Sequence, residues 1–131
     1  MDFSSLWPNG FIFLIIFNKY HDDPSLIGNM AGTMHLFNVV CNCNNRTGTG
    51  IMASGGFLYV NACTVNNANT AIEVNSTSVI SVFSVSGTGN TIAFRSSVGL
   101  LIIASGTIAA TTRRQVANGG IISEGGVVYT S

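Results

Sequence analysis

The feature that most constrains this chain is a repeat. Thr49, Thr70, Thr91 and Thr112 follow one another at equal intervals, and the first three stand in similar phrases, with Gly or Asn before the threonine and Ile shortly after it. A fixed period of about 20 to 50 residues is typical of proteins built from stacked units, in which each unit buries its apolar face against the next. The spacing therefore predicts that the four threonines align at one corner of a stack of coils.

At this 21-residue period the middle of the chain divides into similar units. Most units open on a short alternating stretch such as Ile72-Glu73-Val74, pass through polar residues and reach a second apolar run. Alternation of this kind is the pattern of a strand with one buried face, and the units end on Asn, Gly and Ser, which favour turns. We therefore expect residues 29–131 to be all-β repeats, in units 29–49, 50–70, 71–91, 92–112 and a shorter 113–131.

Two all-β folds fit short strands separated by turns. A β-sandwich has no reason to repeat at a constant period, whereas a single-stranded parallel β-helix, or solenoid, requires one, because each coil rises by one strand spacing of about 4.8 Å and must land in register. The repeat thus favours the solenoid with 21-residue coils, and the β-sandwich is the alternative. The expected inward positions are Ile51, Ile72, Val74, Ile92 and Phe94, with members of the runs 57–60, 79–83 and 100–103.

Residues 71–80 add a resemblance to a known family. They read Ala-Ile-Glu-Val-Asn-Ser-Thr-Ser-Val-Ile, which resembles the G-I-x-V-x-x-S-x-x-V/I coil of pectin-lyase-like right-handed parallel β-helices, including those of bacteriophage tailspikes and fibres. Ala71 and Thr77 depart from this pattern at its Gly and Ser positions. The resemblance covers residues 29–112 and implies the fold, while the activities hosted by that fold are diverse.

Residues 1–28 fit the 21-residue period poorly. Their apolar run, 11–17, is shorter than the roughly 20 residues that a membrane-spanning helix needs. Its β-branched and aromatic content favours a buried strand, with a membrane or secretion role as the alternative. An open solenoid end exposes strand edges and requires an atypical terminal unit, so we expect 1–28 to form an N-terminal cap or interface segment without a membrane span.

The low charge of the chain limits the kinds of partner that it can bind. Charged residues make up 8% of the sequence and the formal net charge is zero, against about 25% charged residues in typical soluble proteins. A chain without a basic surface does not attract phosphate backbones, so we expect no nucleic-acid partner. Little charge opposes self-association, and we expect a homo-oligomer, with a trimer as the preferred form.

The cysteines and acidic residues give no clear catalytic pattern. Cys41, Cys43 and Cys63 are odd in number, so we expect buried free thiols rather than a complete disulfide framework or a metal site. Glycoside hydrolysis uses two carboxyl groups about 5 to 9.5 Å apart, whereas Glu73 and Glu124 hold different coil positions and are expected on different faces. We assign no catalytic, cofactor-binding or metal-binding residue and expect no enzyme; the acidic residues are Asp2, Asp22, Asp23, Glu73 and Glu124.

Two function classes remain. The first is a structural or adhesive β-helix module of a virion surface, tail fibre or tailspike, located on a virion or extracellular surface and mediating assembly or attachment. The second is a polysaccharide-binding or polysaccharide-cleaving β-helix protein. The neighbouring Arg113 and Arg114 are expected in a solvated bend or a salt bridge. The aromatic candidates for contact with a cell-surface glycan or an interface are Trp7, Tyr20, Tyr59 and Tyr129.

Overall fold

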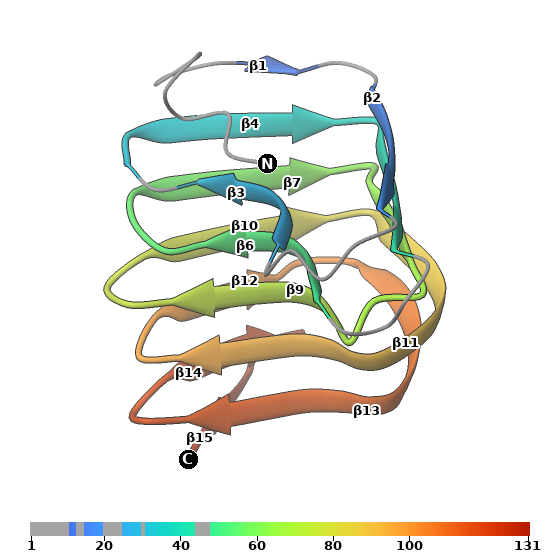
Figure 1. Cartoon of the computed structure of the whole chain (residues 1–131). Helices are drawn as coiled ribbons and strands as arrows, with labels where there is room; N and C mark the ends of the chain where they lie inside the picture. Colours follow the sequence, from blue (N-terminus) through green and yellow to red (C-terminus); the bar gives the residue numbers. More distant parts are fainter. Residues whose placement is uncertain (1–10, 13–14, 20–24, 30, 44–47) are drawn as a thin grey trace.

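The chain folds into a parallel β-solenoid. The structure is a computed structural model and describes residues 11–12, 15–19, 25–29, 31–43 and 48–131 (Figure 1). These residues contain strands and turns but no helix, and the strands stack in parallel coils of about four turns. The predicted solenoid is therefore confirmed, and the β-sandwich is not observed.

One side of the solenoid is a seven-stranded sheet. Its strands pair in parallel from coil to coil, except that the last one returns antiparallel to its neighbour and ends the sheet. In spatial order the strands are β1 (Phe11–Ile12), β4 (Thr33–Phe37), β7 (Phe57–Asn61), β10 (Val79–Phe83), β12 (Leu100–Ile103), β14 (Ile121–Glu124) and β15 (Val127–Thr130).

The remaining strands form an eight-stranded sheet. The long strand β11 joins its two halves, because its first part pairs with β8 and its second part with β9, and β13 pairs with β11 in the next coil. The strands are β2 (Ile15–Lys19), β5 (Val39–Cys43), β8 (Thr64–Asn66), β11 (Val85–Ser97), β9 (Thr70–Asn75), β6 (Thr49–Ala53), β3 (Ser25–Asn29) and β13 (Gly106–Ala117).

The coil length varies along the chain. Ile51 pairs with Ile72, one 21-residue period later, but on its other side it pairs with Ile27, which lies further away in the sequence than one period. The connection from β5 to β6 is longer than the equivalent connection from β8 to β9. This difference explains why the N-terminal sequence fits a 21-residue period poorly: β1, β2 and β3 pair in parallel with β4, β5 and β6 in a longer coil. The cap or interface role of residues 1–28 stays a prediction.

The prediction that the four threonines align in a single row is wrong. Thr49 pairs with Thr70 as expected, but Thr70 pairs with Ile92, and Ile92 in turn pairs with Thr112. Thr91 is therefore one residue out of the ladder. The stretch from Val74 to Val79 is one residue longer than the paired stretch from Ala53 to Phe57, and this extra residue moves the next partner from Thr91 to Ile92.

The core consists of columns of inward side chains that stack from coil to coil. Burying an aliphatic or aromatic side chain in such a column contributes about 1.5–3 kcal/mol relative to leaving it exposed. Ile51, Ile72, Val74 and Phe94 are buried as predicted, whereas Ile92 is half-buried. One column contains Ile27, Ile51, Ile72 and Phe94, and a second contains Leu36, Val60, Val82 and Ile103.

The corners of the coils use residues in the left-handed backbone region. At the corner after β9, β11 and β13, Ser76, Val98 and Asn118 have φ values of 54°, 74° and 53°. Asn adopts this region readily, whereas a β-branched residue there is an outlier. The backbone of Val98 is therefore strained at a corner position that Asn118 occupies without strain.

Candidate functional site

A groove runs over the outer surface of the seven-stranded sheet. Side chains along a strand point alternately to its two faces. Leu36, Val60 and Val82 are buried, so the residues before and after each of them point outward from β4, β7 and β10. The groove encloses about 270 Å³. Its lining residues are His35, Leu36, Phe37, Tyr59, Val60, Asn61, Ser81 and Phe83.

Aromatic rings stack along this surface because strand pairing aligns them. His35 and Tyr59 are register partners on β4 and β7, and their ring centroids lie 4.5 Å apart with an interplanar angle of 24°. Phe57, two residues before Tyr59, has its ring centroid 4.5 Å from that of Tyr59 at 31°. Ring contacts at this separation are favourable for aromatic pairs, and they hold the Tyr59 ring in place while 40% of that residue stays exposed.

Polar groups lie beside the exposed rings. Ser81 is the register partner of Tyr59, and Asn61 is the register partner of Phe83. Phe83 is 55% exposed, which is unusual for a large apolar side chain on a sheet. The groove therefore presents flat apolar rings with a hydroxyl and an amide beside them, and no Asp, Glu, Lys or Arg is among its lining residues.

The structure separates the aromatic residues that the sequence suggested. Tyr59 lies in the groove, whereas Tyr129 lies on β15 at the other end of the solenoid, with the Arg114 guanidinium 4.1 Å from its ring centroid. Trp7 and Tyr20 fall outside the described residues. Sequence reasoning missed Phe83, although it alternates with the inward Val82 on β10 and so holds an outward position.

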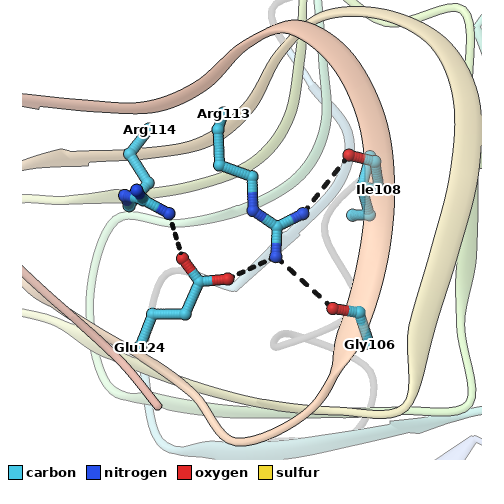
Figure 2. Close-up of polar contacts among 5 residues, drawn as sticks. All are labelled: Gly106, Ile108, Arg113, Arg114 and Glu124. Carbon is cyan, nitrogen blue, oxygen red and sulfur yellow. Dashed lines mark hydrogen bonds and ion pairs between the residues drawn. The ribbon is translucent and has the colours of Figure 1, made fainter. Parts of the chain in front are cut away.

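A charged cluster closes the C-terminal end of the core columns (Figure 2). Phe94 pairs with Arg114, and Ile103 pairs with Glu124, so two buried apolar columns end in opposite charges. The Glu124 carboxylate forms ion pairs with both Arg113 and Arg114. The salt-bridge expectation for the two arginines is therefore confirmed.

Further contacts hold the arginines of this cluster. Arg113 donates hydrogen bonds of 3.4 Å to the carbonyl oxygens of Gly106 and Ile108, and its guanidinium lies 5.0 Å from the centroid of the Phe94 ring. Burial alone would raise the pKa of Glu124, but the hydrogen bonds and charges of the two arginines outweigh it and lower the pKa. The cluster pairs its carboxylate with the two guanidinium groups at the point where the apolar columns stop, so its evident role is structural.

The other described carboxylate is engaged elsewhere. Glu73 accepts a 2.9 Å hydrogen bond from the Thr49 hydroxyl, and its other oxygen lies 3.7 Å from the Arg95 guanidinium. Glu73 belongs to the eight-stranded sheet and Glu124 to the seven-stranded sheet, in agreement with the expected separation. Asp2, Asp22 and Asp23 lie outside the described residues.

The three cysteines are buried thiols outside any disulfide, as predicted. Burial raises the pKa of Cys63 to about 11 and also raises that of Cys41, where the neighbouring Cys43 and Cys63 add to the effect. A thiol with a raised pKa is a poor nucleophile at neutral pH. Within the part of the chain that the structure describes, His, Cys, Asp and Glu form no group of three or more suited to a metal ion.

A scan of the chain against protein-family models finds no match, and searches of curated proteins and of solved structures find none. No helix in the described ranges is long and apolar enough to cross a membrane.

Proposed function

We propose that this protein is a structural and adhesive module in which the solenoid serves as a rigid scaffold and the aromatic groove binds a glycan. The observation that carries the proposal is the exposure of Tyr59 and Phe83, 40% and 55%, within one groove that also contains the Asn61 amide and the Ser81 hydroxyl. Exposed aromatic side chains held on a rigid sheet are suited to a binding surface, because they need little reordering to make contact.

The chemistry of the groove fits an uncharged sugar. A sugar ring has a flat face of C–H groups, which packs on an aromatic ring, and a rim of hydroxyls, which hydrogen-bond to amides and hydroxyls. A volume of about 270 Å³ lies just under the roughly 300–1,000 Å³ of sites that enclose a small ligand. A short stretch of a longer glycan lying across β4, β7 and β10 matches this groove better than an enclosed substrate does.

The setting follows from the resemblance of residues 71–80 to the coils of pectin-lyase-like β-helices, including those of bacteriophage tailspikes and fibres. We place the module on a virion or extracellular surface, as a fibre or spike component that assembles with copies of itself. Polysaccharide cleavage is the second candidate. It is less favoured because Glu73 and Glu124 lie in different sheets and each already interacts with arginine.

A glycan array tests the proposal. The wild-type protein is expected to bind a restricted set of glycans, and Tyr59→Ala and Phe83→Ser are expected to weaken binding about two- to tenfold each, since loss of a stacking aromatic costs about 0.5–1.5 kcal/mol. Ile121→Ala is the matched control, because Ile121 is an exposed apolar residue of the same sheet outside the groove.

Two results would count against the proposal. Absence of any bound glycan, or binding that survives both groove substitutions, would remove its basis. Shortening of a bound oligosaccharide during incubation would favour the cleavage alternative instead.

A further inference from the structure

The two exposed rings of the groove have different surroundings. Tyr59 lies against the rings of His35 and Phe57, with both centroid distances at 4.5 Å and interplanar angles of 24° and 31°. Rings this close and this nearly parallel overlap through their faces, whereas edge-to-face pairs stand close to perpendicular. Contacts within the protein therefore already use ring-face area of Tyr59, and they fix the direction in which its hydroxyl points.

Phe83 has a freer ring. It is 55% exposed, and within the described ranges no aromatic ring and no guanidinium stacks on it. Its side chain carries no polar atom, so a ligand gains from it only by covering the ring. Phe83 is therefore suited to an apolar contact, in which the flat face of a ligand packs on the ring.

The strand register places these two residues at opposite corners of a rectangle of four outward side chains. Tyr59 pairs with Ser81, and Asn61 pairs with Phe83. Tyr59 and Phe83 are thus separated by one strand spacing of about 4.8 Å and by two residues of about 3.3 Å each, so their Cα atoms lie roughly 8 Å apart. A ligand that covers Phe83 therefore reaches the polar groups at the other three corners as well.

The polar groups of this rectangle are available to a ligand. On the outer face of the eight-stranded sheet, the Thr64 and Ser86 hydroxyl oxygens lie 2.9 Å apart and hydrogen-bond to each other across the coils. The Tyr59 hydroxyl, the Asn61 amide and the Ser81 hydroxyl differ from them, because none of the three makes a side-chain hydrogen bond to any described residue. Their hydrogen-bonding capacity is therefore open to a partner that lies in the groove.

We propose a division of roles within this rectangle, which rests on the glycan-binding function proposed above. Phe83 stacks on the C–H face of one sugar ring, and Tyr59 is a specificity-determining residue whose hydroxyl hydrogen-bonds one sugar hydroxyl. A phenolic hydroxyl both donates and accepts, and here the neighbouring rings fix its position, so it matches a hydroxyl at one place on the ligand. A glycan that lacks this hydroxyl leaves the Tyr59 hydroxyl without its partner in the covered groove and binds more weakly. The ligand class is an uncharged glycan in which a flat C–H face and a free hydroxyl lie side by side.

Titration calorimetry with an oligosaccharide selected on the glycan array tests the two roles. Tyr59→Phe keeps the ring contacts and removes only the hydroxyl, and it is expected to weaken binding about two- to tenfold, the effect of one hydrogen bond. Phe83→Leu keeps the apolar bulk without the flat ring and is expected to weaken binding by about two- to tenfold as well. Phe83→Tyr keeps the ring and is expected to bind like the wild type. Circular dichroism of each variant controls for its fold.

Monodeoxy derivatives of the same oligosaccharide identify the sugar hydroxyl. The wild type is expected to bind one derivative about two- to tenfold more weakly than the parent oligosaccharide. Tyr59→Phe is expected to bind this derivative and the parent equally, because the protein hydroxyl and the sugar hydroxyl act as a pair.

The outcomes separate this inference from the glycan-binding function. If Tyr59→Ala and Phe83→Ser weaken binding but Tyr59→Phe or Phe83→Leu binds like the wild type, the division of roles is overturned while the groove stays the binding site. It is also overturned if each deoxy derivative weakens binding to the wild type and to Tyr59→Phe by the same factor. If no glycan binds, or if binding survives both groove substitutions, the glycan-binding function itself fails and this inference fails with it.

Discussion

Removing the charge of Glu124 should destabilise the end of the solenoid substantially. In Glu124→Gln the side chain keeps its shape, but the guanidiniums of Arg113 and Arg114 lose their carboxylate and face an amide. A hydrogen bond to a charged group contributes about 1.5–3 kcal/mol. The arginine side chains are 32% and 30% exposed and Glu124 is 18% exposed, so solvent screening places each contact at or below the lower end of that range. The two together give a loss of about 2–3 kcal/mol in the free energy of unfolding.

Urea unfolding followed by circular dichroism as a function of pH measures this loss and identifies its cause. The arginines lower the pKa of Glu124 below its ordinary value of 4.5, so in the wild type their stabilising effect is fully present above about pH 4.5 and is lost as the pH falls through the lowered pKa. Glutamine does not titrate. The difference in stability between wild type and Glu124→Gln should therefore be constant at neutral pH and close in strongly acidic solution.

Glu73→Gln serves as the comparison, because Glu73 faces a single arginine at 3.7 Å and the Thr49 hydroxyl. Glu73→Gln should therefore lower the free energy of unfolding less than Glu124→Gln does. The reasoning is refuted if Glu124→Gln is as stable as the wild type at pH 7. It is also refuted if the difference persists undiminished at low pH, because the loss would then come from shape rather than charge.

Two further predictions concern the corner and the core. Val98→Asn should stabilise the protein by about 1 kcal/mol, because asparagine adopts the left-handed backbone at φ 74° with less strain than a β-branched residue; a thermal midpoint that stays the same or falls contradicts this. Ile72→Asp should abolish the cooperative β signal in circular dichroism, since it buries an unpaired charge at a fully buried position at a cost of several kcal/mol. Thr77→Asp, at an exposed turn, is its control, and a folded Ile72→Asp protein would show that the core register is wrong.

The architecture could be predicted from the sequence because the repeat constrains every coil in the same way. Each coil must bury one face of its strands, so Ile51, Ile72 and Phe94 could be assigned to inward positions without knowing the exact turns, and the structure stacks them in one column. Turn length was not predictable in the same way. One extra residue between Val74 and Val79 is invisible to a search at a fixed period, and it displaced Thr91 from the ladder.

The groove was harder to predict than the core. It depends on outward side chains from three coils, and both steps, from His35 to Tyr59 and from Tyr59 to Ser81, are longer than the 21-residue period, so a search at that period does not bring these residues together. The charged cluster had a sequence signal in Arg113-Arg114, two charges in an uncharged region. Its partner Glu124 could not be identified from sequence, because the pairing of β14 with β12 at the end of the seven-stranded sheet is what places it beside the arginines.

The most direct test of the central claim is an amide NMR titration of the protein with an oligosaccharide selected on the glycan array. The account predicts saturable shift changes centred on β4, β7 and β10, strongest near Tyr59, Asn61, Ser81 and Phe83, with little change near Tyr129 at the C-terminal end. Shift changes that cluster away from the groove, or none at saturating oligosaccharide, would contradict it.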